Sequence, residues 1–154
     1  MYEKLLTEAE NSGLTVIERY PFQSSRIRGL CCDDTIAISA QVETTAERTV
    51  VLCEELTHAQ HSYGDILENK HLERRTRERT FDRLIGKKGL VRGYLSGCRS
   101  SWEFAEFFGV PENFFHEAMM NYRERFGTET TVTLDKVRYS LSFEPHFTVK
   151  KQLA

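Results

Sequence analysis

This chain of 154 residues has few of the features that mark membrane-bound or secreted proteins. No apolar run approaches the ~18 residues that a transmembrane helix needs. Residues 1–10 lack the basic-then-apolar order of a signal peptide. The four cysteines include an adjacent pair but no Cys-x-x-Cys metal pair, and their spacing is not that of a disulfide framework. We therefore expect a cytoplasmic protein with no membrane contact.

The net charge is also small, at −2, although 29% of the residues are charged, and these residues are unevenly placed. Residues 1–69 hold 12 acidic and 5 basic residues, whereas residues 70–92 hold 9 basic and 3 acidic residues. The basic stretch could meet nucleic acid or an acidic partner. Its acidic residues Glu73, Glu78 and Asp82 recur at helical spacing among arginines, which is more typical of a solvated helix face with internal ion pairs.

The hydrophobic pattern predicts an α+β fold. The expected helices span residues 2–12, 46–62, 71–85, 90–97, 101–108 and 111–126. The expected strands span residues 14–18, 29–32 and 35–40, with one or two strands or a mobile tail in 130–149. Thr44 or Thr45 should cap the helix over 46–62, since Glu47 follows in its first turn. We expect three parts, a core over 1–88, a helical subdomain over 89–127 and a strand-like tail over 128–154.

The most informative stretch is residues 49–61, at the end of which one helix face carries acidic and imidazole side chains. Glu54, His58 and His61 stand at i, i+4 and i+7, so they share that face. Carboxylate oxygens and imidazole nitrogens suit a borderline metal such as zinc. Glu55 lies roughly 100° further round the helix, beside this face. The spacing is that of His-Glu-x-x-His with Glu54 in the first position, so Glu54 and His58 are candidate ligands and Glu55 is the candidate general base.

A hydrolytic zinc site needs a third protein ligand. Glu73, at the start of the next expected helix, is our main candidate, because residues 59–70 are long enough to lay the two helices antiparallel. His61 and His71 are the alternatives.

Residues 102–118 resemble a helix-turn-helix with Gly109 at its turn. The second helix presents Glu112, His116 and Glu117 where a recognition helix needs basic or amide side chains. Direct nucleic-acid binding is therefore not expected, and packing or partner docking is the favoured use of the aromatic residues. They are Phe104, Phe107, Phe108, Phe114 and Phe115.

The motifs, in their order and spacing, resemble the ImmA/IrrE-type metallo-endopeptidases of phages and mobile elements. The stretches that carry the resemblance are Arg-Gly-Leu and Thr-Ile-Ala-Ile-Ser, then Glu-Arg-Thr-Val-Val-Leu-Cys-Glu-Glu-Leu-Thr-His and Ser-Tyr-Gly-Asp-Ile-Leu, then Leu-Glu-Arg-Arg-Thr-Arg-Glu-Arg-Thr-Phe-Asp-Arg-Leu-Ile, Trp-Glu-Phe-Ala-Glu-Phe-Phe-Gly-Val-Pro and Tyr-Arg-Glu-Arg-Phe-Gly. The chain departs from the family at Glu54, where many members have histidine, and at Thr57, where a glycine is usual.

This resemblance implies a zincin-like minimal metallopeptidase domain, a small sheet plus an active-site helix, followed by a helical subdomain. It implies that Glu54, His58 and Glu73 bind Zn²⁺ and that Glu55 is the general base. A carboxylate ligand at position 54 shifts the preference toward harder ions such as Mn²⁺.

In related zincins an extended substrate pairs with an exposed strand edge beside the active-site helix. Here the corresponding strand over 35–40 would offer Thr35, Ile36, Ala37 and Ile38. The implied partner is a phage-type helix-turn-helix repressor, whose cleavage would derepress the genes that it silences. The alternative function is a non-catalytic antirepressor, which binds the repressor without cleaving it.

Overall fold

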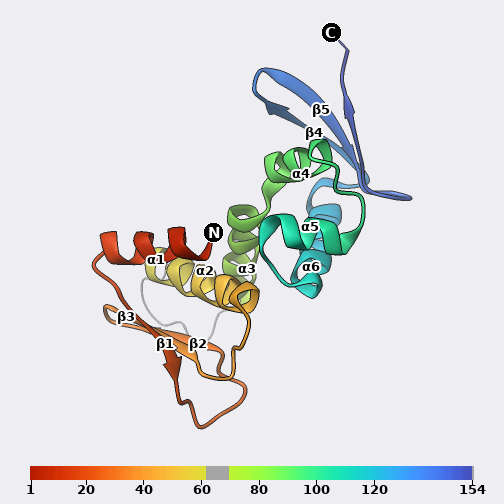
Figure 1. The fold of residues 1–154 in the computed structure, drawn as a ribbon. Helices are drawn as coiled ribbons and strands as arrows, with labels where there is room; N and C mark the ends of the chain where they lie inside the picture. Colours follow the sequence, from red (N-terminus) through yellow and green to blue (C-terminus); the bar gives the residue numbers. More distant parts are fainter. Residues whose placement is uncertain (62–69, 154) are drawn as a thin grey trace. The chain divides into compact units, whose positions relative to one another are not determined.

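The computed structural model describes residues 1–61 and 70–153 and divides into two compact units, Met1–Leu84 and Ile85–Ala154. Both units combine helices with a small sheet, so the expected α+β class is confirmed. The first unit contains α1 (Tyr2–Asn11), β1 (Thr15–Tyr20), β2 (Gly29–Cys32), β3 (Thr35–Ser39), α2 (Thr45–His61) and α3 (Lys70–Leu84) (Figure 1). The second contains α4 (Gly86–Leu95), α5 (Ser101–Phe108), α6 (Glu112–Phe126), β4 (Glu129–Leu134), β5 (Val137–Ser142) and β6 (Thr148–Lys151). The division into three parts at residues 88 and 127 stays a prediction.

The sheet of the first unit has the strand order β1-β3-β2. β2 and β3 form the expected antiparallel hairpin, and Asp33 occupies its turn with φ of 52°, a left-handed conformation that aspartate tolerates better than most residues. β1 pairs with β3 in parallel, with Val16 opposite Ile36. The hairpin follows from the local sequence, whereas the parallel pairing joins strands that are distant in the chain.

The position of β3 corrects one expectation. We expected residues 35–40 to offer an exposed edge to a substrate, but β3 is the central strand and is paired along both edges. Its residues Thr35, Ile36, Ala37 and Ile38 therefore have no free edge, and the last three of them are buried. In the part of the chain that the structure describes, β2 is the strand beside α2 whose outer edge pairs with no other strand.

Helices α1 and α2 lie against each other and α2 packs on β2 and β3 (Figure 1). The core between them consists of aliphatic side chains with little or no exposure, since burying them supplies the main driving force for folding. It contains Leu5, Ala9, Ile36, Ile38, Val51, Leu52 and Leu56. α3 then packs on α2, so that α2 contacts the sheet on one side and a helix on another.

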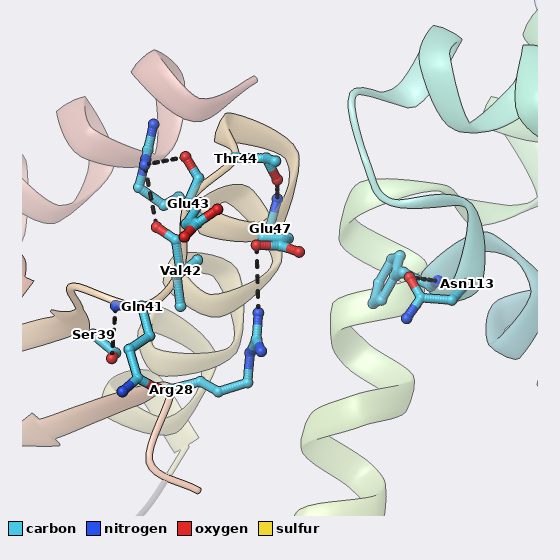
Figure 2. A network of polar contacts seen from close by, with 10 residues as sticks. Arg28, Ser39, Gln41, Val42, Glu43, Thr44, Glu47 and Asn113 are labelled. Atoms are coloured by element: carbon cyan, nitrogen blue, oxygen red, sulfur yellow. Dashed lines mark hydrogen bonds and ion pairs between the residues drawn. The ribbon is translucent and has the colours of Figure 1, made fainter. Parts of the chain in front are cut away.

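The start of α2 is fixed by side chains of its first turn and of the loop before it (Figure 2). The hydroxyl of Thr44 accepts a hydrogen bond from the backbone N–H of Glu47 at 3.1 Å, which identifies Thr44 as the capping residue. The carboxylate of Glu47 pairs with Arg28 at 3.7 Å, and Arg48 donates to the carbonyl of Glu43 at 2.9 Å. These contacts set the point from which the helix runs toward residues 54–58.

The second unit is built on an aromatic core. Phe104 stacks on Phe115 with ring centroids 5.3 Å apart, and Phe108 and Phe114 are also buried. Phe107 is 45% exposed, so four of the five phenylalanines named from the sequence belong to the core. α5 begins with a complete capping box between Ser100 and Glu103.

The C-terminal residues form more regular structure than expected. β4, β5 and β6 make an antiparallel sheet in that order, so residues 129–151 are neither a mobile tail nor limited to two strands. Alternating side chains such as Leu134, Leu141 and Val149 are buried. Among the described residues, none of the helices is long and apolar enough to cross a membrane.

Candidate functional site

The second half of α2 directs its polar side chains in two directions. The preceding residues Val51, Leu52 and Cys53 are buried in the core. Their burial fixes the orientation of α2 about its own axis. Glu54 then faces α3, where it forms an ion pair with Arg77. Glu55 faces β2, where its Cγ lies 3.2 Å from the position that a Cβ on residue 29 would take.

A cavity of about 500 Å³ lies along α2 and α3. Its lining includes all three predicted metal ligands, Glu54 and His58 from α2 and Glu73 from the first turn of α3. The other described residues in the lining are Arg74, Thr76 and Arg77. The fold therefore brings the three donors to one space, although Glu73 is separated from the other two along the chain.

Two features of the side chains that line the cavity bear on metal binding. The Nδ1 atom of His58 is buried and has no hydrogen-bond partner among the described residues. A buried imidazole nitrogen without a partner is costly, and a metal ion is one group that would satisfy it. In contrast, the Oε1 atom of Glu54 is already paired with the guanidinium of Arg77.

Glu54, His58 and Glu73 are side chains of the types that bind a divalent ion, but in this structure they are not arranged around a common point. Two carboxylates and one imidazole can ligate zinc or manganese. Within residues 1–61 and 70–153, however, no three His, Cys, Asp or Glu side chains are close enough together to hold an ion. An ion that takes the Oε1 atom of Glu54 would have to displace the guanidinium of Arg77 from it. Neither His61 nor His71 is among the described residues that line the cavity, so neither of these alternative ligands is favoured.

Glu55, the candidate general base, lies outside the described lining of this cavity. Burial and, next, the charge of Glu54 raise the pKa of Glu55 from 4.5 to about 7, while a hydrogen bond from the backbone N–H of Cys31 offsets part of the rise. A carboxyl group with a pKa near neutrality can accept and return a proton at physiological pH.

The contact with Cys31 places Glu55 beside the outer edge of β2. The backbone N–H of Ser39 donates to the carbonyl of Arg28 at 2.8 Å. Hydrogen-bonded and non-hydrogen-bonded pairs alternate in an antiparallel ladder, so the backbone groups of Gly29 and Cys31 point away from β3. The Cys31 N–H already donates to Glu55, so a further strand would bind to the Gly29 N–H and to the carbonyls of Gly29 and Cys31.

Thr57 stands where the family that the chain resembles usually has glycine. Its side chain is 1% exposed, and its hydroxyl donates to the carbonyl of Cys53 at 2.8 Å. The threonine therefore packs inside the unit with its polar atom satisfied, and it takes no space from the cavity.

Sequence reasoning missed Arg77, which pairs with one predicted ligand and lines the same cavity. A signal was present, because Glu73 and Arg77 stand at i, i+4 on the expected second helix and so share a face. The sequence predicts solvated ion pairs for the arginines of this helix, and that description fits Arg74, which pairs with Glu78.

A scan against protein-family models and searches of curated proteins and of solved structures found no match to this chain. The resemblance to the ImmA/IrrE-type enzymes therefore rests on the motifs of the chain itself.

Proposed function

We propose that this chain is a metal-dependent endopeptidase that cleaves a regulatory protein, a helix-turn-helix repressor of the phage type. The observation that carries the proposal is the cavity along α2 and α3. It collects Glu54, His58 and Glu73, and the buried Nδ1 atom of His58 has no hydrogen-bond partner among the described residues. No other arrangement of the described residues combines these donors with a neighbouring carboxyl group of near-neutral pKa.

In this proposal Glu54, His58 and Glu73 hold a zinc ion, with manganese as the alternative. The bound ion supplies Lewis acidity toward a peptide carbonyl and toward water. A carboxylate oxygen of Glu55 takes the proton of the attacking water and passes it to the amine nitrogen that leaves. The substrate binds as an extended strand on the free edge of β2, through the Gly29 N–H and the carbonyls of Gly29 and Cys31, because the Cys31 N–H already donates to Glu55. This replaces the edge of β3 that the sequence suggested.

The second candidate is a non-catalytic antirepressor, which binds the repressor and leaves it intact. The observation in its favour is the ion pair between Glu54 and Arg77, which uses one of the three donors. A protein of this kind needs the surface of the first unit but no assembled ligand set.

The two candidates are distinguished by an assay that tests whether wild-type protein and the Glu55→Gln variant cleave a repressor. Purified wild-type protein and variant are incubated with zinc and candidate helix-turn-helix repressors, and the products are identified by mass spectrometry. The enzyme proposal expects cleavage by the wild type, its loss in chelator, and its loss in Glu55→Gln with metal content unchanged. Glu47→Gln, at the far end of the same helix, is the matched control and should cleave normally. A repressor that is bound equally by wild type and Glu55→Gln, and is cleaved by neither, would support the antirepressor instead.

A further inference from the structure

The ion pair between Glu54 and Arg77 joins two helices across the candidate metal site. Arg77 lies on α3, 23 residues after Glu54, and its Nη1 reaches the Oε1 of that carboxylate. The guanidinium also lies over the ring of Phe81, 5.4 Å from its centroid. Both contacts hold the positive charge of Arg77 at the cavity.

Among the described residues that line the cavity, the charges balance without any ion. Two carboxylates, Glu54 and Glu73, face two guanidiniums, Arg74 and Arg77. The two arginines differ in their surroundings. The Arg74 side chain is 67% exposed and pairs with Glu78 on its own helix at 3.4 Å. The side chains of Arg77 and Glu54 are only 33% and 27% exposed, so this pair is screened less by water.

We propose that Arg77 is an internal counter-cation, which occupies Glu54 in the metal-free protein and which a divalent ion must displace in order to bind. This inference rests on the proposed function, because it concerns the same three ligands. An oxygen atom of Glu54 paired with a guanidinium cannot at the same time ligate an ion at full strength, so the two cations compete for it. Arginine keeps its charge at any physiological pH, so protonation cannot relieve the competition. The metal affinity of the chain is therefore set by Arg77 as well as by the ligands.

Zinc titration calorimetry of wild type, Arg77→Gln and Arg74→Gln tests the inference. Both substitutions remove one positive charge from the same cavity, but only the first removes the pair with Glu54. We expect Arg77→Gln to bind zinc about tenfold more tightly than the wild type, which is the factor for losing one partly buried, charge-assisted contact. Arg74→Gln should stay within about threefold of the wild type, as for an exposed charge. Arg77→Lys keeps the charge without the planar fork, so its affinity should fall between those of wild type and Arg77→Gln.

The pair itself is measured without metal, by a double-mutant cycle of Glu54→Gln and Arg77→Gln unfolded with urea in chelator. We expect a coupling of about three- to tenfold in the unfolding equilibrium constant. No coupling would overturn the inference, and so would equal gains in zinc affinity for Arg77→Gln and Arg74→Gln. If the wild type binds zinc and Arg77→Gln binds it no more tightly, the inference fails while the metal site stands. If neither protein binds zinc although the coupling is present, the proposed function fails, and the displacement of Arg77 fails with it.

Discussion

Replacing Gly29 with alanine tests how closely β2 approaches the helix that carries the site. A Cβ at residue 29 would lie 2.5 Å from the Cγ1 of Val51 and 3.2 Å from the Cγ of Glu55. Ordinary van der Waals contact begins at 3.4 Å, so one of the two elements must move by roughly 1 Å. Val51 is buried in α2, and its branched side chain has a single favoured rotamer in a helix, so it cannot rotate away.

The expected cost follows from two opposing effects. Overpacking a well-filled site costs about 1–3 kcal/mol. Alanine also restricts the unfolded chain, which stabilises the folded state by about 0.4–1 kcal/mol where the backbone conformation suits it. Gly29 lies in a regular β-strand, so alanine fits its backbone. We therefore expect Gly29→Ala to lower the free energy of unfolding by about 1–2 kcal/mol.

Urea unfolding of wild type, Gly29→Ala, Val51→Ala and the double variant provides the measurement. Val51→Ala removes the obstructing methyl group, so adding Gly29→Ala to it should cost nothing or stabilise by a few tenths of a kcal/mol. The two substitutions are thus expected to be non-additive by about 1–2 kcal/mol. If Gly29→Ala is neutral alone, or costs the same in both backgrounds, β2 does not approach α2 as described.

Three further predictions concern single side chains. Because folding raises the pKa of Glu55 from 4.5 to about 7, the metal-free protein should lose stability as pH rises through this range. Glu55→Gln should remove that loss and stabilise at pH 8 by up to about 3 kcal/mol in urea unfolding, and parallel pH profiles would contradict this. Burial raises the pKa of Cys53 to about 11, so iodoacetamide should label exposed Cys32 first and Cys53 only after unfolding, as mass spectrometry can check. Ser100→Ala breaks the capping box with Glu103 and should cost about 1 kcal/mol in thermal unfolding, whereas an unchanged transition would contradict the cap.

Local signals in the sequence were enough to predict most elements of the fold. The capping residue Thr44, the turn at Asp33 and the capping box at Ser100 each act within a few residues, so they can be read without knowing the rest of the chain. The helix over 101–108 has the predicted bounds for this reason. The break between α3 and α4 is shorter than expected, because Gly86, with φ of 68°, turns the chain at one point and the next helix starts at once.

Long-range pairing could not be predicted in the same way. The parallel pairing of β1 with β3 places Thr15 opposite Thr35, and the sequence of neither strand indicates which strand it pairs with. Without that pairing, β3 looked like an edge strand, and the free edge was assigned to the wrong element. The strands after residue 128 were underestimated because moderate alternation does not distinguish a paired strand from a tail.

The candidate site was predictable to the extent that it depends on helical spacing. The shared face of Glu54 and His58 follows from their separation by four residues, and the cavity brings Glu73 to them. Two features depend on how neighbouring elements pack and so were not predictable, namely the contact of Glu55 with β2 and the reach of Arg77 from α3 to Glu54.

The most direct test of the metal site is the metal content of the purified protein, measured by elemental analysis for wild type, Glu54→Ala and His58→Ala. The proposed function predicts about one zinc or manganese ion per wild-type chain and its loss in both variants. Wild-type protein without metal after equilibration with zinc, or metal that both variants retain, would contradict the proposal that Glu54 and His58 form a metal site.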